Sequence, residues 1–391
     1  MTAFALVALS LSLPPTPAPA EDFAPDWGKI ETSIRTRYYA REARKDEMNR
    51  LLAKYAPIVK AAADRKAFDA AVDAMIAEFR DSHFDFLTAD EQGYYLMDSL
   101  LRREGAEEMP NVGAWFRRDG DGYTVQMVLE GGPAAKAGLR AGDLVTGVDG
   151  TPFSPVEALR ERVGKTVPLT YRRGGVEATA PVTVAKTRAL KMFLDASRES
   201  TRVIEQGGRK FGYFHLWTQA NDDFKNALSA AIYGRLRETD GFILDLRGGF
   251  GGRPEGFADP FFRPDMDLAW KTSPTGGYTQ SFGYGRPLVV LIDRGSRSAK
   301  ELLSFILQKS RRATLVGETT AGHVLGTSPA RINDWSFIEI PMVDVAVQGV
   351  RLEGKGVSPD VRVSQTPSAD GKDATVEKAV EILLKKVGAK R

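Results

Sequence analysis

The chain has 391 residues, of which 42% are hydrophobic and 27% charged, as in a soluble globular protein of two or three domains and not a disordered chain. Its 54 Lys and Arg nearly balance its 51 Asp and Glu, giving a net charge of +3, and no block of like charge suggests nucleic-acid binding. It contains no cysteine, which excludes disulfides, cysteine-ligated zinc and a cysteine nucleophile.

The first twenty residues are typical of an export signal. Residues 3–13 are apolar, prolines follow, and Ala18-Pro-Ala20 before Glu21 has the small-x-small pattern of a cleavage site. A flexible Ala/Pro-rich tail is the alternative. No later segment reaches about 18 uninterrupted apolar residues, the length that spans a bilayer. We therefore expect a periplasmic or secreted mature protein with no integral membrane segment.

Residues 21–104 are expected to form a helical N-terminal region. Apolar residues three and four apart predict helices over 46–55 and 66–79. Pro57 is expected to lie between helical segments. After the second helix comes a short polar motif, Asp81-Ser82-His83.

Residues 105–190 change to short strand-like runs separated by turns with glycine, over 123–128, 144–148, 167–172 and 178–184. The segment from Pro133 to Gly150 resembles the PDZ-domain signature, close to P-A-x-x-A-G-L-x-x-G-D-x-I-x-x-V-x-G. The resemblance implies a β-rich domain whose groove takes an extended peptide by strand addition. Its carboxylate-binding loop and first strand would then contain the candidate peptide-binding residues Gly113, Ala114 and Trp115.

Residues 195–391 alternate strands and helices, which predicts an α/β domain. The expected strands cover 211–216, 241–246, 287–292, 313–316 and 336–347. The expected helices cover 222–237, 299–309 and 375–387.

Ser298 lies between an expected strand and an expected helix. It forms a capping box with Glu301, which is a purely structural interpretation. The same position suits a nucleophile, because amides at a helix N-terminus, such as that of Ala299, stabilise an oxyanion. The glycine-rich turn 248–252 lacks the patterns of nucleotide-binding loops. It either builds an oxyanion site from backbone N–H groups or is a plain tight turn.

A catalytic serine needs a base, and the chain has three histidines. His215 lies in an apolar strand and is interpreted as structural. His323 follows Ser298 by about 25 residues, and His83 lies far upstream. From the residues alone, either His83 or His323 could be the base. The role of Glu353, which lies in a turn-rich stretch, is also left open.

Together these motifs resemble the C-terminal processing and tricorn-type serine peptidases over nearly the whole mature chain. The resemblance rests on Asp81-Ser82-His83, the PDZ signature, Asp245-Leu-Arg247 with its glycines, Ser298-Ala-x-Glu301, Gly317-Glu-x-Thr-x-Gly322 and Glu353-Gly-x-Gly-Val-x-Pro-Asp360. It implies an α/β multidomain protein with an N-terminal helical region, a PDZ domain and a ββα-spiral core of the ClpP/crotonase type.

The family has two catalytic designs. One pairs the serine with a lysine about 25 residues later, but that position holds His323, and Lys300 is expected to point away. The tricorn-like design uses Ser, His and Glu, which implies Ser298 as nucleophile, His83 as base and Glu353 as the orienting acid. Ser82 would support the site. The sequence departs from the usual run at Gly249, which replaces an Asn, and at Phe250, which replaces a Gly. Gly251 is the oxyanion donor expected beside Ala299.

The resemblance therefore implies an exported serine endopeptidase that cleaves peptides or unfolded proteins, with a PDZ domain that captures substrate or gates activity. It implies no cofactor, no metal and no nucleic-acid partner, and leaves the oligomeric state open. The alternative is a catalytically inactive peptide- or lipid-binding protein on the same fold.

Overall fold

Three helices begin the part of the chain that the structure, a computed structural model, describes: residues 21–102, 104–364 and 372–388. They are α1 (Ala24–Arg37), α2 (Lys45–Lys60) and α3 (Arg65–Phe79). Pro57 lies inside α2 and does not separate two helices, contrary to expectation. The helix continues because Val59, beyond the proline, is fully buried, so packing outweighs the hydrogen bond that proline removes. The expected export signal lies outside the described residues.

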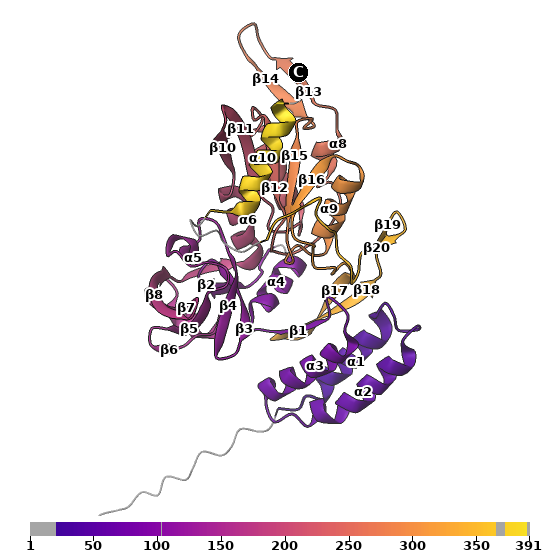
Figure 1. The fold of residues 1–391 in the computed structure, drawn as a ribbon. Helices are drawn as coiled ribbons and strands as arrows, with labels where there is room; N and C mark the ends of the chain where they lie inside the picture. Colours follow the sequence, from indigo (N-terminus) through magenta and orange to yellow (C-terminus); the bar gives the residue numbers. More distant parts are fainter. Residues whose placement is uncertain (1–20, 103, 365–371, 389–391) are drawn as a thin grey trace, which may run out of the picture.

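The three helices pack on strands from the far end of the chain (Figure 1). β1 (Asp85–Thr88) pairs antiparallel with β18 (Ser336–Val343), which also pairs with β17 (Gly326–Asn333). Helices and strands share one hydrophobic core, which includes Ile30, Leu51, Phe68, Phe86, Ile338 and Ile340. The strand that directly follows His83 is therefore joined to the C-terminal half of the protein.

A β-rich domain follows α4 (Gln92–Leu101), with the strand order β3-β4-β5-β7-β8 and β6 on β5. Its elements are β3 (Ala114–Asp119), β4 (Gly122–Val128), α5 (Pro133–Lys136), β5 (Leu144–Val148), β6 (Thr151–Pro152), the 3₁₀ helix η1 (Glu157–Arg162), β7 (Thr166–Arg173) and β8 (Val176–Thr183). The flanking strands β2 (Glu108–Asn111) and β9 (Ala185–Arg188) pair with each other. The domain therefore enters and leaves the rest of the molecule at one place.

The core is a six-stranded sheet in the order β10-β11-β12-β15-β16-β21, parallel except for its first pair. Its strands are β10 (Arg202–Gln206), β11 (Arg209–His215), β12 (Gly241–Asp245), β15 (Leu288–Ile292), β16 (Ala313–Gly317) and β21 (Val361–Arg362), and its main helices are α6 (Ala189–Glu199), α7 (Asp222–Tyr233), α9 (Ala299–Lys309) and α10 (Ala374–Gly388). Helix α10 packs on one face through Ala379 and Leu383. Helices α6, α7 and α9 pack on the other face.

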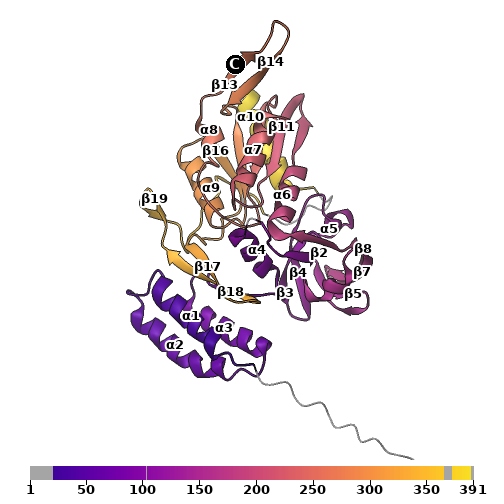
Figure 2. The same cartoon turned by 180° about the vertical axis from the view of Figure 1, so that it is seen from behind.

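Two predicted elements are shorter than expected. The helix expected over 222–237 ends at Tyr233, and the strand expected over 336–347 is divided into β18 and β19 (Ala346–Val347), which pairs with β20 (Val350–Arg351). After the short α8 (Asp259–Phe262), a hairpin of β13 (Met266–Lys271) and β14 (Gly277–Phe282) projects from the core (Figure 2). Within the described ranges, no helix has both the length and the apolar character needed to cross a membrane.

Candidate active site

Ser298 lies in a sharp turn between β15 and α9 and has a strained backbone. Its φ of 59° and ψ of −131° are unusual for a residue with a side chain, and such strain concentrates at functional sites. The Ser298 N–H donates to the carbonyl of His323 at 2.7 Å and to the Glu301 carboxylate at 3.2 Å. The surrounding chain thus holds a conformation that serine alone disfavours.

Glu301 supplies the capping box expected from the sequence and does more than cap the helix. Its fully buried carboxylate also accepts from the Thr320 hydroxyl at 2.5 Å and from the amides of Gly322 and His323 at 2.7 and 2.8 Å. One side chain therefore joins the serine turn to the loop 320–323.

The glycine-rich turn after β12 packs directly against Ser298. A Cβ on Gly251 would lie 2.3 Å from Ser298 Cβ and 2.9 Å from the Ala299 nitrogen, so only glycine fits. The amides of Gly248, Gly249 and Phe250 are occupied, by Asp293 Oδ1, Met127 Sδ and the Trp217 carbonyl respectively.

Two amides near the serine remain available. Among the described residues, no acceptor is found for the N–H of Gly251 or for that of Ala299. These are the two donors that the sequence suggested for an oxyanion site. Phe250, the departure from the usual glycine run, turns its ring toward Trp115 and Phe193, at centroid distances of 5.0 and 5.4 Å.

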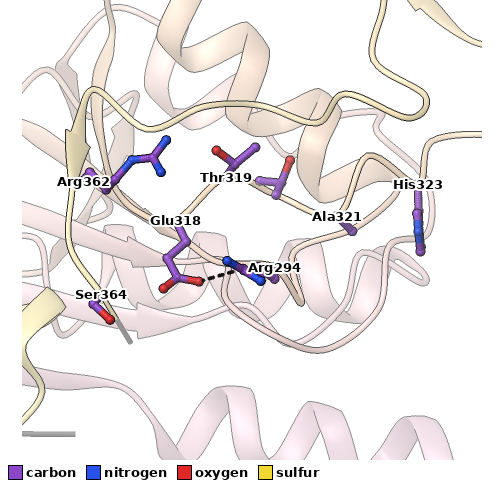
Figure 3. Close-up of a pocket in the computed structure, with 8 residues that line it drawn as sticks. Arg294, Glu318, Thr319, Ala321, His323, Arg362 and Ser364 are labelled. Atoms are coloured by element: carbon purple, nitrogen blue, oxygen red, sulfur yellow. Dashed lines mark ion pairs between the residues drawn. The ribbon is translucent and has the colours of Figure 1, made fainter. Parts of the chain in front are cut away.

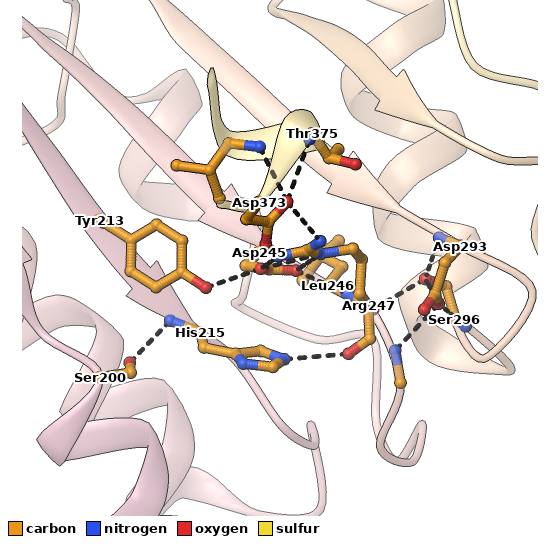
Figure 4. Close-up of polar contacts among 12 residues, drawn as sticks. Ser200, Tyr213, His215, Asp245, Leu246, Arg247, Asp293, Ser296, Asp373 and Thr375 are labelled. Carbon is orange, nitrogen blue, oxygen red and sulfur yellow. Dashed lines mark hydrogen bonds and ion pairs between the residues drawn. The ribbon is translucent and has the colours of Figure 1, made fainter. Parts of the chain in front are cut away.

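A buried polar network anchors the strand ends below this turn (Figure 4). Arg247 donates to the fully buried Asp245 from Nε at 3.0 Å and binds Asp373 just before α10 at 2.7 Å. Tyr213 donates to Asp245 at 2.7 Å. Figure 4 also shows the Asp293–Ser296 turn, where the Ser296 hydroxyl donates to the Leu246 carbonyl at 2.8 Å. Asp245 and Arg247 thus have a structural role.

His215 belongs to this network and not to the serine site. Its Nε2 contacts the Arg247 carbonyl at 3.0 Å, and its Nδ1 contacts Glu130 of the β-rich domain at 2.9 Å. Burial alone would lower the pKa of His215, but the nearby carboxylates of Asp245 and Glu130 outweigh it and raise the pKa. Glu130 also accepts from Trp217 Nε1 at 2.6 Å, which ties the two domains together.

His83 lies between α3 and β1, on a segment that is held from both sides. Arg44 binds the neighbouring Asp81 at 2.7 Å, and β1 is paired with β18. The Ser82 hydroxyl lies 3.1 Å from His83 Nδ1. Burial, with the charge of Arg297 and then that of His323, lowers the pKa of the half-buried His83 to about 3.

The structure brings His83 and His323 together, with ring centroids 6.2 Å apart. His323 is exposed, and its main chain holds Ser298 and Glu301. Within the described ranges, no hydrogen bond joins His83 to Ser298 or to Glu353. Glu353 accepts from the amides of Val324 and Leu325 at 2.7 and 3.2 Å. It therefore orients the segment between His323 and the start of β17.

A pocket of about 460 Å³ opens beside this loop (Figure 3). It is lined by Arg294, Glu318, Thr319, Thr320, Ala321, His323, Arg362 and Ser364. Figure 3 shows His323 at one end and Arg362 at the other, with the Arg294–Glu318 ion pair of 3.2 Å between them. The pocket borders the serine turn through His323, and Ser298 and His83 are not part of its lining.

The candidate peptide-binding residues are already occupied by the chain itself. The Gly113 amide donates to Asn111 Oδ1 at 3.0 Å. Gln92, at the start of α4, donates from Nε2 to the Ala114 carbonyl at 2.9 Å and accepts from the Phe116 amide at 3.0 Å. Trp115 points toward the α/β core, where its ring lies 5.5 Å from that of Phe193 on α6.

Sequence reasoning missed two residues of this region. Gln92 is 4% exposed, and no local pattern marked it. Lys300 was expected to point away from the site, which is wrong: it is fully buried, and Nζ donates to the Gly248 carbonyl at 2.8 Å. No local sequence pattern predicts either contact, because each joins segments that come together only when the chain folds.

Comparisons with known proteins agree with this architecture. Residues 210–363 match the model of peptidase family S41, and residues 110–184 match that of the PDZ domain. Over 370 residues the chain is 27% identical to a tricorn protease homolog of Streptomyces coelicolor, covering 85% of this chain and 30% of the relative. Over 251 residues it is 29% identical to a carboxyl-terminal-processing protease of Synechocystis sp., covering 61% of this chain and 58% of the relative.

The fold is similar to that of a photosystem II D1 C-terminal processing protease, with a TM-score of 0.56 and 23% identity over 89% of this chain and 95% of that one. The helical region, PDZ domain and α/β core predicted from the sequence are confirmed. The chain spans less than two thirds of the length of the two curated relatives.

Proposed function

Because residues 210–363 match the model of peptidase family S41 and residues 110–184 that of the PDZ domain, we propose that this chain is a serine endopeptidase acting on peptides or unfolded proteins. One observation carries the proposal: a serine with φ of 59° whose side chain is packed against Gly251 and Ala299, the two residues with available amides. An unpaired first amide such as that of Ala299 occurs at every helix start, but a plain helix cap requires neither the strained backbone nor the unpaired Gly251 amide beside the serine.

In this proposal Ser298 Oγ attacks the substrate carbonyl and passes its proton to Nε2 of His83, which later gives it to the leaving amine. The N–H groups of Gly251 and Ala299 receive the developing oxyanion. In this proposal Nδ1–H of His83 donates a hydrogen bond to the Ser82 hydroxyl, which lies 3.1 Å away, and Nε2 stays unprotonated as the base. Glu353 acts as a positioning residue for the loop after His323.

The proposal is tested with a fluorophosphonate, which reacts with activated serines, and with an unfolded protein such as reduced casein. We expect labelling of the full chain at Ser298 and cleavage of the casein. Absence of both would contradict the peptidase and favour the binding protein on the same fold.

We further propose that the PDZ domain gates activity. Gln92 presents one donor and one acceptor to β3, as a residue of an added peptide strand would. Arg160 of η1 holds the same segment by donating to the Ala89 carbonyl at 2.9 Å. This segment continues back through β1 to His83, so a peptide that displaces Gln92 would disturb the base.

Replacing Gln92 by alanine is therefore expected to open the groove. Without the competing side chain, a peptide with a free apolar C-terminus should bind about tenfold more tightly, a difference of about 1.4 kcal/mol. Fluorescence anisotropy of a labelled peptide measures this, and Gln308→Ala on the exposed side of α9 is the matched control. Equal affinity of both variants and the parent would contradict the gate.

We also propose that the mature protein is exported. The apolar run, the prolines and Ala18-Pro-Ala20 precede Glu21, and α1 begins at Ala24, so cleavage after Ala20 spares the described fold. N-terminal sequencing of the protein from a periplasmic extract should start at Glu21. An intact Met1 in that protein would contradict cleavage.

A further inference from the structure

Lys300 is a buried cation for which the reaction described above has no role. It is the second residue of α9, and its side chain is fully inaccessible to solvent. Burying an ammonium group is costly unless it is paired and hydrogen-bonded. Here Nζ makes its hydrogen bond to one backbone atom, the Gly248 carbonyl at 2.8 Å.

That carbonyl belongs to the turn that carries the available Gly251 amide. Gly248 and Gly249 both have positive φ, 54° and 68°, so the direction of each peptide plane is set by its contacts and not by side-chain sterics. A Cβ on Gly249 would lie 2.8 Å from Lys300 Nζ and 2.0 Å from the Trp217 carbonyl. The turn is thus packed between Lys300 and Trp217, which follows the end of β11.

The Arg297 guanidinium lies over the Phe250 ring of this turn, 4.6 Å from its centroid, and the hydrogen bonds of the turn come from neutral groups and one carboxylate. Asp293 Oδ1 accepts from the Gly248 amide at 2.9 Å, and Met127 Sδ accepts from the Gly249 amide at 3.0 Å. The Gly251 carbonyl accepts from Gln219 N at 2.7 Å and from Thr218 Oγ1 at 2.8 Å. Lys300 is the cation that the structure places on this turn through a hydrogen bond.

Charged groups face Lys300 from three elements. Asp293 in the turn before α9, Asp245 at the end of β12 and Glu130 of the PDZ domain favour its protonated form, and Arg297 disfavours it. Burial is the largest influence and lowers the pKa of Lys300 to about 7. The ammonium is therefore in exchange with the neutral amine near neutral pH.

We propose that Lys300 is a positioning residue of the oxyanion hole: its ammonium holds the Gly248 carbonyl and thereby keeps the Gly251 N–H directed at Ser298. The inference rests on the proposed peptidase function. Because the residue acts through the turn, its loss lowers the rate of acylation and leaves substrate affinity nearly unchanged.

Two variants of the full chain separate charge from hydrogen bonding. Lys300→Met keeps the shape and removes the donor, and Lys300→Gln keeps a neutral donor. The matched control is Lys309→Met on the exposed end of the same helix. The readouts are the rate of fluorophosphonate labelling, kcat and KM on a small ester, and the thermal midpoint, which reports folding.

We expect Lys300→Met to lower labelling rate and kcat by about 10- to 100-fold, somewhat less than loss of a direct oxyanion donor, with KM changed by less than about 3-fold. Lys300→Gln should recover part of the loss, and Lys309→Met should match the parent. In the parent the labelling rate should fall as pH rises through about 7, since deprotonation weakens the charge-assisted bond. That fall should be absent in Lys300→Gln.

Labelling of folded Lys300→Met at the parental rate would overturn the inference, as would an identical pH profile in Lys300→Gln. If Lys300→Met does not fold, the Lys300→Gln profile alone decides. A parent chain that is not labelled at all would contradict the proposed peptidase, whereas a labelled parent with insensitive variants would contradict only the role of Lys300.

Discussion

Replacing Ser298 by alanine is expected to abolish both fluorophosphonate labelling and casein cleavage. Removing the nucleophile of a serine peptidase lowers kcat by about 10⁴-fold or more, because only binding and the oxyanion hole remain. The measurement is labelling and turnover of the purified variant beside Ser304→Ala, in which a buried serine of the same helix is lost. Activity that survives in Ser298→Ala would assign the chemistry to another residue.

The same position also affects the stability of the fold. The free energy of unfolding of Ser298→Ala should be about 1 kcal/mol lower than that of the parent, since the helix loses its cap. Ser298→Gly should be more stable than the alanine variant by about 1 kcal/mol, because glycine tolerates a φ of 59° without strain. Urea unfolding of the two variants measures this difference. A glycine variant less stable than the alanine variant would show that the turn stores no strain.

Replacing His83 by alanine is expected to reduce turnover by about 10³-fold or more, as loss of a triad base does. His323→Ala should lower it by less than about tenfold, because His323 serves Ser298 and Glu301 through its main chain and its ring is exposed. Steady-state kinetics on a small ester compare the two. Full activity in His83→Ala with none in His323→Ala would show that His323 is the base.

The pH profile separates the two histidines independently. The folded-state pKa of His83 is about 3, lowered first by burial and then by the Arg297 charge. A general base must be unprotonated, so kcat/KM should not fall between pH 7 and pH 5 through His83. Arg297→Gln removes a cation that opposes protonation, raises the pKa of His83 and moves the acid limb to higher pH. An unshifted acid limb in that variant would contradict His83 as the base.

The sequence by itself determined most features that depend on neighbouring residues, although Pro57 lies inside α2 and the helix expected over 222–237 ends at Tyr233. The PDZ signature follows from glycines that suit tight turns, and the helix over 299–309 begins where expected because Ser298 and Glu301 cap its N-terminus locally. The order of motifs identified the helical region, the PDZ domain and the α/β core, which the comparisons confirm.

Only the tertiary structure decided the contacts that join distant segments. The pairing of β1 with β18 brings the His83 segment to the core, and Gln92 closes the edge of β3. Lys300 turns inward, and Glu353 holds the amides after His323 and not His83. These contacts form because polar groups that are buried when the layers pack need hydrogen-bond partners. The partner can come from any segment that the fold brings nearby. A local sequence pattern therefore does not predict which residue the partner is.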